Sequence, residues 1–251
     1  MIKGIYTSAL GLIPLQKKLE VIANNLANVD TTAFKRDDSF ANQLISANTV
    51  VNNGSVDPTQ NDVSEQTFTD FSQGPLQQTS NPLDVAIDGH GFFVVQNQDG
   101  STSLTRDGSF TLSSDGTLVT RNGATVMGAD GPIRIGDIQQ IQSSSLVIDR
   151  YGVVKAGKEI YGQLRVVMPS SYSAISKAGG NLYSLQQGAQ LQDVNPSSVT
   201  IRQGYLEGSN VNPIEEMVAM IQIQQDFEAG QKAIQSQNTT LSEANQVGQV
   251  A

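Results

Sequence analysis

Cysteine and tryptophan are absent from the 251 residues of this chain, and histidine occurs once. Without cysteine, no disulfide and no thiolate metal site can form. His90 lies between two glycines, and no second histidine could complete a metal-binding set. No serine stands in the strand–turn–helix context that exposes a nucleophile. We therefore expect no enzyme activity, no bound metal and no cofactor.

Basic residues are also scarce: 15 Lys and Arg oppose 24 Asp and Glu, so the net charge is −9 and the pI is near 4.5. Nucleic-acid binding needs clustered Lys and Arg, and here they are scattered. No run of about 18 apolar residues occurs, so no transmembrane helix is expected. The N-terminus does not follow the secretory signal pattern, because only Lys3 precedes the apolar stretch, polar residues interrupt it and no cleavage site follows.

The first thirty residues carry a heptad pattern. Two apolar lines three residues apart form the a/d stripe of a helix that packs along another helix: Ile5, Leu12, Leu19 and Leu26, and Leu15, Ile22 and Val29. Gly4, Gly11 and Pro14 disfavour an isolated helix here, and Pro14 predicts a kink or regularity only beyond it. Asn, Asp and Thr compete for backbone hydrogen bonds after Leu26, so we expect the helix to end near Val29.

The other end of the chain predicts a second long helix, from Asn212 towards Asn245. Asn212 is a good N-cap, Pro213 suits the first helical position, and Glu215 stands three residues after the cap. One apolar line recurs every seven residues: Met220, Phe227, Ile234 and Leu241. We expect Val218, Ile221 and Ala244 to widen it. The amides Gln224, Gln231 and Asn238 would then face either other subunits or water.

Between the helices, residues 37–80 are polar and irregular, with a short helix expected around Phe40, Leu44 and Ile45. The rest of this stretch is typical of a linker that is disordered in the free chain. Residues 81–203 instead show short alternating segments separated by Asp-Gly and Asn-Gly pairs, which is typical of antiparallel hairpins. These pairs lack the ligand spacing of a calcium loop.

The sequence thus predicts an α+β protein. The two terminal helices would pair as a coiled-coil-like shaft formed by residues 1–36 with 204–251. Residues 37–80 would be a linker or extended region that orders on assembly, and residues 81–203 a central all-β domain of short antiparallel hairpins.

Four motifs in this order resemble those of the bacterial flagellar rod and hook proteins. The first is Ile22-Ala23-Asn24-Asn25-Leu26-Ala27-Asn28-Val29 with Thr31-Thr32-Ala33-Phe34-Lys35-Arg36, and the second is Pro82-Leu83-Asp84-Val85-Ala86-Ile87-Asp88-Gly89-His90-Gly91-Phe92-Phe93. The third is Leu104-Thr105-Arg106-Asp107-Gly108-Ser109-Phe110 with Asp115-Gly116-Thr117-Leu118-Val119, and the fourth is Gly204-Tyr205-Leu206-Glu207-Gly208-Ser209-Asn210-Val211-Asn212 with Glu215-Glu216-Met217-Val218. The family more often has glycine where this chain has Ala33. The resemblance covers both ends and the centre of the chain.

The resemblance implies a non-enzymatic structural subunit of the flagellar basal-body rod. It would polymerise helically, transmit motor torque to hook and filament, and be exported by the flagellar apparatus without a cleaved signal peptide. Its partners would be its own copies, other rod and hook proteins, the export apparatus and the surrounding rings. The expected assembly residues are Ile5, Leu12, Leu15, Leu19, Ile22, Asn24, Asn25, Leu26, Asn28, Phe34, Met220, Phe227, Ile234 and Leu241.

Within this family the motifs favour a proximal rod protein, although the stretch 204–211 is as similar to the distal one. Two other classes fit the pattern less well. A secreted adhesin-like β protein would trimerise through its helices into a soluble stalk. A carbohydrate-active enzyme would need two carboxylates about 5–10 Å apart, and nothing in the sequence places such a pair.

Overall fold

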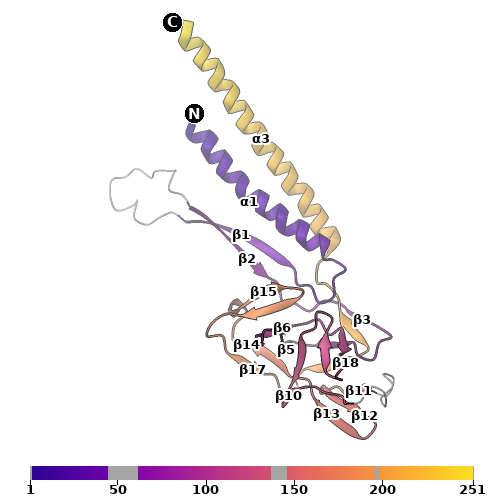
Figure 1. The fold of residues 1–251 in the computed structure, drawn as a ribbon. Helices are drawn as coiled ribbons and strands as arrows, with labels where there is room; N and C mark the ends of the chain where they lie inside the picture. The colour runs from indigo at the N-terminus through magenta and orange to yellow at the C-terminus, as the bar shows by residue number, and fades with distance from the viewer. Residues whose placement is uncertain (1, 45–61, 137–145, 196–197, 251) are drawn as a thin grey trace. The chain divides into compact units, whose positions relative to one another are not determined.

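The computed structural model describes residues 2–44, 62–136, 146–195 and 198–250 (Figure 1). It is an α+β protein with a central, β-rich region of antiparallel strands and a long helix towards each end of the chain. The contacts among Cα atoms divide it into two compact units. Unit 1 comprises residues 1–29, 35–71 and 211–251, and unit 2 comprises residues 30–34 and 72–210.

Among its described residues, unit 1 has the helices α1 (Ile2–Ala27) and α3 (Pro213–Val250) and the hairpin strands β1 (Asp37–Leu44) and β2 (Asp62–Thr69). The strands β1 and β2 pair antiparallel, from Asp37 opposite Thr69 to Leu44 opposite Asp62. The short helix expected around Phe40 is therefore wrong for the described residues up to Leu44, while Ile45 lies outside them. Pairing with β2 along the whole of β1 outweighs the weak local helical preference of this segment.

Helix α1 runs through Pro14 and is assigned as helical from Ile2, although regularity was expected only beyond Pro14. It ends at Ala27, close to the predicted end. At the start of α3, the backbone N–H of Ile214 donates to Asn212 Oδ1 at 3.1 Å, which confirms the predicted N-cap. Glu215 accepts a 2.9 Å hydrogen bond from the Asn212 side-chain amide, and this bond holds the cap in place.

The described part of unit 2 holds the remaining strands and a short 3₁₀ helix. The strands before the gap at 137–145 are β3 (Leu76–Gln78), β4 (Val85–Asp88), β5 (Phe92–Gln96), β6 (Thr102–Thr105), β7 (Phe110–Leu112), β8 (Leu118–Thr120), β9 (Thr125–Gly128) and β10 (Gly131–Pro132). After it come β11 (Leu146–Ile148), β12 (Val153–Ala156), β13 (Glu159–Gln163), β14 (Val166–Pro169), η3 (Tyr172–Ala174), β15 (Ile175–Gly179), β16 (Leu182–Leu185), β17 (Leu191–Asp193), β18 (Thr200–Gln203) and β19 (Tyr205–Glu207).

The largest sheet of unit 2 follows the order β15-β16-β6-β5-β9-β8-β7; in addition, β10 pairs with β9, and β14 pairs with both β5 and β17. Smaller sheets are β11-β12-β13, β18-β4 and β19-β3. All the pairings are antiparallel. A core of Val, Ile, Leu and Phe side chains fills the space between strands and includes an edge-to-face contact of Phe93 with Phe110 at 5.2 Å between ring centroids.

Glycine serves two different purposes in the Asp-Gly pairs. Gly116 has φ +75 and lies in the tight turn between β7 and β8, as the hairpin prediction requires. Gly108 does not adopt a positive φ. A Cβ built there would overlap the carbonyl oxygen of Val85, so this glycine permits two backbones to approach closely.

The segment 30–34 places Ala33 in the left-handed region, with φ +57. This is where the resembling family more often has glycine. The position is strained for a residue with a Cβ, by about 1–2 kcal/mol. It is maintained because Ala33 is fully buried and its N–H donates to the carbonyl oxygen of Glu207 at 2.7 Å.

A buried ion pair lies beside this segment within unit 2. Arg106 Nη1 lies 3.2 Å from Glu207 Oε2, and both side chains are almost completely buried, at 2% and 0% exposed. The second carboxylate oxygen of Glu207 accepts the backbone N–H of Gly74 at 2.9 Å, and the guanidinium carbon of Arg106 lies 5.3 Å from the Phe92 ring centroid. This pair therefore connects β19 with the residue that follows β6 and with the backbone at Gly74, just before β3.

We expect Arg106→Met to lower the free energy of unfolding by roughly 3–5 kcal/mol, because it leaves the Glu207 carboxylate buried without its partner. The matched control is Arg202→Met, which removes the exposed pair with Asp88 and should lower stability by at most about 1 kcal/mol. Urea unfolding followed by circular dichroism measures both. Equal effects of the two variants would contradict the assigned role of Arg106.

Candidate assembly site

Most of the predicted assembly residues of α1 lie on one side of that helix. Ile22 is buried, and Leu12, Leu15, Leu19 and Leu26 are half-buried. Asn28 is half-buried and Asn24 is exposed, whereas the side chain of Ile5 lies outside the described part of the structure. Val21, which was not among the predicted residues, is buried as well.

On α3 the predicted line Met220, Phe227 and Ile234 is half-buried, while the Leu241 side chain lies outside the described part. A second inward line was missed. It is formed by Glu216, Ile223, Gly230 and Gln237, which are buried or half-buried at a spacing of seven residues. Together the two lines alternate by four and three residues, which is the spacing of a heptad seam.

The expected widening of the stripe by Val218 and Ile221 is wrong for this chain. Val218 is 58% exposed and Ile221 is 56% exposed. A rotation of 100° per residue puts them roughly opposite the line of Ile223 and Gly230. Gln224, Gln231 and Asn238 are also exposed, so in the single chain these amides face solvent.

Gly230 marks a close approach of the two helices of unit 1. A Cβ built on Gly230 would come within 2.6 Å of Leu12 Cδ2, which is closer than real side chains allow. The absence of a side chain at Gly230 therefore gives Leu12 a place to pack, as small residues do where helix backbones come together.

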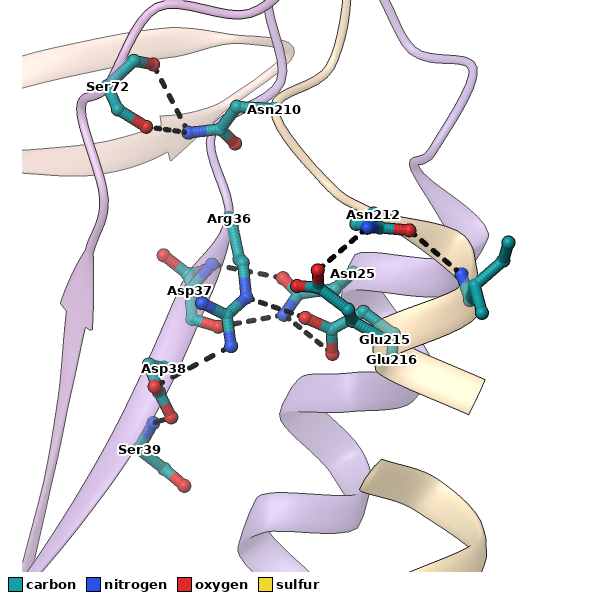
Figure 2. A network of polar contacts seen from close by, with 11 residues as sticks. Asn25, Arg36, Asp37, Asp38, Ser39, Ser72, Asn210, Asn212, Glu215 and Glu216 are labelled. Atoms are coloured by element: carbon teal, nitrogen blue, oxygen red, sulfur yellow. Dashed lines mark hydrogen bonds and ion pairs between the residues drawn. The ribbon is translucent and has the colours of Figure 1, made fainter. Parts of the chain in front are cut away.

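Asn25 connects three elements of unit 1 (Figure 2). Its amide is 1% exposed. Its Nδ2 donates to the carbonyl oxygen of Asp37 at 2.8 Å, and its Oδ1 accepts the Asp37 N–H at 3.0 Å. Nδ2 also lies 3.4 Å from Glu216 Oε2. The amide thus pairs with the backbone at the start of β1 and also contacts the first turn of α3.

Glu216 is the acceptor at the centre of this network. Arg36 Nε donates to its Oε1 at 2.6 Å, and the Glu216 side chain is only 3% exposed whereas that of Arg36 is 39% exposed. The hydrogen bond to Glu216 raises the pKa of Arg36 above its ordinary value, with burial opposing this rise and the nearby carboxylates adding to it. Glu216 also lies in the first turn of α3, where a negative charge interacts favourably with the helix dipole.

Phe34, the remaining predicted residue, lies in unit 2. It is buried within the chain, with the ammonium of Lys177 4.3 Å from its ring centroid. Sequence analysis missed Arg36 and Glu216 as a pair. Arg36 follows the end of α1 and Glu216 lies in the first turn of α3, each within one of the motifs, but their separation of 180 residues hides the contact.

The described residues offer little basis for other kinds of site. No group of three or more potential metal ligands occurs among them. His90 is exposed. No helix in the described parts of the chain is long and apolar enough to cross a bilayer.

Comparison with known proteins places three family matches in order along the chain. Residues 5–35 match "Flagella basal body rod protein". Residues 86–156 match "Flagellar hook protein FlgE/F/G D1 domain", and residues 202–247 match "Flagellar basal body rod FlgEFG protein C-terminal". The last match begins at β18, and the first includes Asn25.

Several characterised proteins are similar over almost their whole length. The flagellar basal-body rod protein FlgG of Buchnera aphidicola is 33% identical over 274 aligned positions, covering 98% of this chain and 100% of the relative. FlgF of Caulobacter vibrioides is 32% identical over 229 positions, covering 91% of each. FlgG of Borreliella burgdorferi is 33% identical over 265 positions, covering 98% of each.

We expect Asn25→Ala to lower the free energy of unfolding of unit 1 by roughly 1–3 kcal/mol, because the Asp37 backbone groups and Glu216 would lose a buried partner. The neighbouring Asn24→Ala is the matched control, since Asn24 is exposed and its loss should change stability by at most about 0.5 kcal/mol. Urea unfolding followed at 222 nm reports the helices. If the two variants unfold alike, Asn25 does not have this structural role.

Proposed function

This chain belongs to the flagellar basal-body rod proteins, and from that membership we propose that it polymerises helically into the rod and transmits motor torque to hook and filament. The family is structural and non-enzymatic. Its members are parts of the flagellar basal body, and the family implies contacts with other rod and hook proteins.

The observation that carries the proposal is the arrangement of apolar positions on the two helices. Two lines of buried or half-buried residues run along α1, and two run along α3. The helices are 26 and 38 residues long, which at 1.5 Å per residue is about 40 and 57 Å. We propose that they pair over their length as a coiled-coil-like shaft, because a close-packed bundle of such helices resists compression and twisting.

The same proposal assigns a role to each part of the chain. Residues 1–36 with 204–251 form the shaft, residues 37–80 order on assembly, and residues 81–203 form the outer β domain. The assembly residues are those predicted from sequence, with Arg36, Glu216 and Asn25 fixing the start of α3 next to the end of α1.

Export and further partners follow from the family. We propose that the chain leaves the cytoplasm through the flagellar export apparatus rather than by a cleaved signal peptide, and that the surrounding ring proteins contact the assembled rod. A trimeric adhesin stalk is disfavoured, because the relatives that cover nearly all of the chain are rod proteins.

Between the two rod segments we propose the proximal one. The alignment with FlgF of Caulobacter vibrioides spans 229 positions for 91% of this 251-residue chain, so it needs almost no gaps in this chain. The alignment with FlgG of Buchnera aphidicola spans 274 positions, so that relative has segments without a counterpart here. The nearly ungapped alignment with FlgF of Caulobacter vibrioides supports the proximal assignment.

We expect Leu19→Asp and Phe227→Asp each to abolish motility, because a carboxylate on either apolar line would be buried without a partner when the helices pack. The measurement is swimming in soft agar, with isolated basal bodies probed for the chain. Leu19→Met and Phe227→Leu are the matched controls, since they keep the positions apolar and should retain motility.

The unit 2 core contains neither residue, so a protease-resistant fragment from about residue 80 to 203 should survive in both aspartate variants. Motile cells carrying either aspartate variant, made at the normal level, would contradict the shaft proposal. Loss of the resistant fragment would instead show general unfolding.

A deletion and complementation experiment distinguishes a proximal rod subunit from a distal one. We expect expression of this chain to restore swimming in cells of its own species that lack only the gene for this chain, and basal bodies isolated before restoration to contain no distal rod protein. A distal subunit would give the opposite picture, in which those basal bodies still contain the FlgF-type protein. Immunoblots of the isolated structures make the distinction.

A further inference from the structure

The chain passes between unit 1 and unit 2 four times, after residues 29, 34, 71 and 210. Any force that is passed between the units along the covalent chain therefore crosses these four positions. Three of them border residues that are joined to one another inside unit 2, namely Phe34, Ser72 and Asn210. We call the hydrogen bonds among these three residues the Asn210 clasp.

Asn210 is the residue that joins the other two. Its backbone N–H donates to the carbonyl oxygen of Phe34 at 3.3 Å. Its side-chain Nδ2 donates to the carbonyl oxygen of Ser72 at 3.2 Å and to the Ser72 hydroxyl oxygen at 3.1 Å (Figure 2). Asn210 thus uses its main chain towards one connection and its side chain towards another.

The side-chain bonds of the clasp continue a backbone ladder of unit 2. Strands β19 and β3 pair antiparallel, and beyond β19 the N–H of Gly208 donates to the carbonyl oxygen of Pro75 at 2.8 Å. A Cβ built on Gly74 would lie 2.2 Å from the carbonyl oxygen of Gly208, so the lack of a side chain lets these backbones approach closely. Two residues further along each chain, the bonds of Asn210 to Ser72 take the place of a backbone rung.

The segment 30–34 is held to unit 2 at several points besides the clasp. The N–H of Ala33 donates to the carbonyl oxygen of Glu207 at 2.7 Å, and Asn181 Nδ2 donates to the carbonyl oxygen of Thr32. Ala33 and Asn181 are the non-glycine residues with positive φ in the described parts of the chain, at +57 and +59. Such backbone strain persists only where the surrounding contacts fix it, so this segment is firmly placed where it enters the clasp.

Unit 1 joins the same three connections again, through Arg36. The carbonyl oxygen of Arg36 accepts the N–H of Asp70 at 2.8 Å, and Arg36 Nε donates to Glu216 Oε1 at 2.6 Å. Three short stretches remain between the two sets of contacts: residue 35, residue 71 and residues 211–215. Since an extended residue spans at most about 3.6 Å, none of these connections is a long flexible linker.

We propose that Asn210 holds these three connections together so that they share the load that the rod carries. The inference rests on the proposed rod function. A connection that is pulled alone opens at its own hydrogen bonds, one after another. Connections that are joined must open together, and this slows forced opening, which is governed by the rate of unfolding. Asn210 is in this sense a positioning residue for force transmission.

Asn210→Ala in the full chain removes the side-chain part of the clasp. Asn97→Ala is the matched control, because the Asn97 amide also donates two hydrogen bonds, to the hydroxyls of Ser101 and Ser103 at 2.9 Å each, but within a single hairpin. Both asparagines are half-buried. Hydrogen exchange followed by mass spectrometry reports the opening of residues 72–76. We expect exchange there to be roughly tenfold faster in Asn210→Ala and unchanged in Asn97→Ala.

Ser72→Ala tests the same bonds from the other side. Ser72 is exposed, so this variant should fold normally. The substitution removes one of the two oxygens that accept from Asn210 Nδ2 and keeps the carbonyl oxygen. We expect a smaller change in the same direction, with exchange of residues 72–76 roughly threefold faster.

The effect of load is measured in cells that carry each variant as the only copy of the chain. In ordinary medium, both Asn210→Ala and Asn97→Ala cells should swim. In medium thickened with methylcellulose, Asn210→Ala cells should release about fivefold more hooks with attached filaments than Asn97→Ala cells, because their connections open one at a time. Immunoblots of the culture supernatant measure the release.

Three results would each overturn the clasp proposal while the rod function stands. They are equal exchange of residues 72–76 in Asn210→Ala and Asn97→Ala, a wild-type exchange rate in Ser72→Ala, and equal release of filaments from the two loaded strains. Absence of the wild-type chain from basal bodies of motile cells would instead refute the proposed function, and the load-sharing role with it.

Discussion

The amide of Asn25 is the interaction on which the described arrangement of unit 1 depends. It pairs with both backbone groups of Asp37 and reaches the carboxylate of Glu216, so one buried side chain joins the end of α1, the start of β1 and the first turn of α3. An amide suits this position because it can donate and accept at once. An aspartate would offer no donor to the Asp37 carbonyl and would add a second negative charge beside Glu216.

Arg36 completes this junction by balancing the buried charge of Glu216. The bond is short and charge-assisted, and the arginine remains partly in water. The arrangement therefore avoids the full desolvation of an ion pair, in contrast to Arg106 and Glu207 in unit 2, which are both buried. The Arg36–Glu216 pair of unit 1 is therefore partly exposed to solvent, whereas the Arg106–Glu207 pair of unit 2 is buried.

The large apolar residues of α3 lie on two different faces of the helix. The inward lines around Ile223 and Gly230 pack within the chain. Four large apolar residues, Ile214, Met217, Val218 and Ile221, instead lie exposed near the start of the helix, where acidic residues are concentrated.

The amino-acid sequence by itself determined the features that depend on near neighbours. These include a helix towards each end of the chain, the Asn212 cap, and the antiparallel hairpins with their Asp-Gly turns. Motifs spread over the whole chain also determined the family. Local periodicity and turn chemistry are properties of a few adjacent residues, so a sequence displays them directly.

Only the tertiary structure decided which contacts join distant parts of each unit. Periodicity identified the line of α3 that includes Met220 and Phe227. It did not show whether the second inward line begins at Met217 or at Glu216, because these neighbours differ by only 100° around the helix and an apolar residue is the usual inward one. The burial of Glu216 depends on Asn25 and Arg36, which lie about 180–190 residues earlier. The strand at 37–44 likewise depends on pairing with 62–69. Such contacts are set by long-range packing, and their energies come from partners that no local pattern reveals.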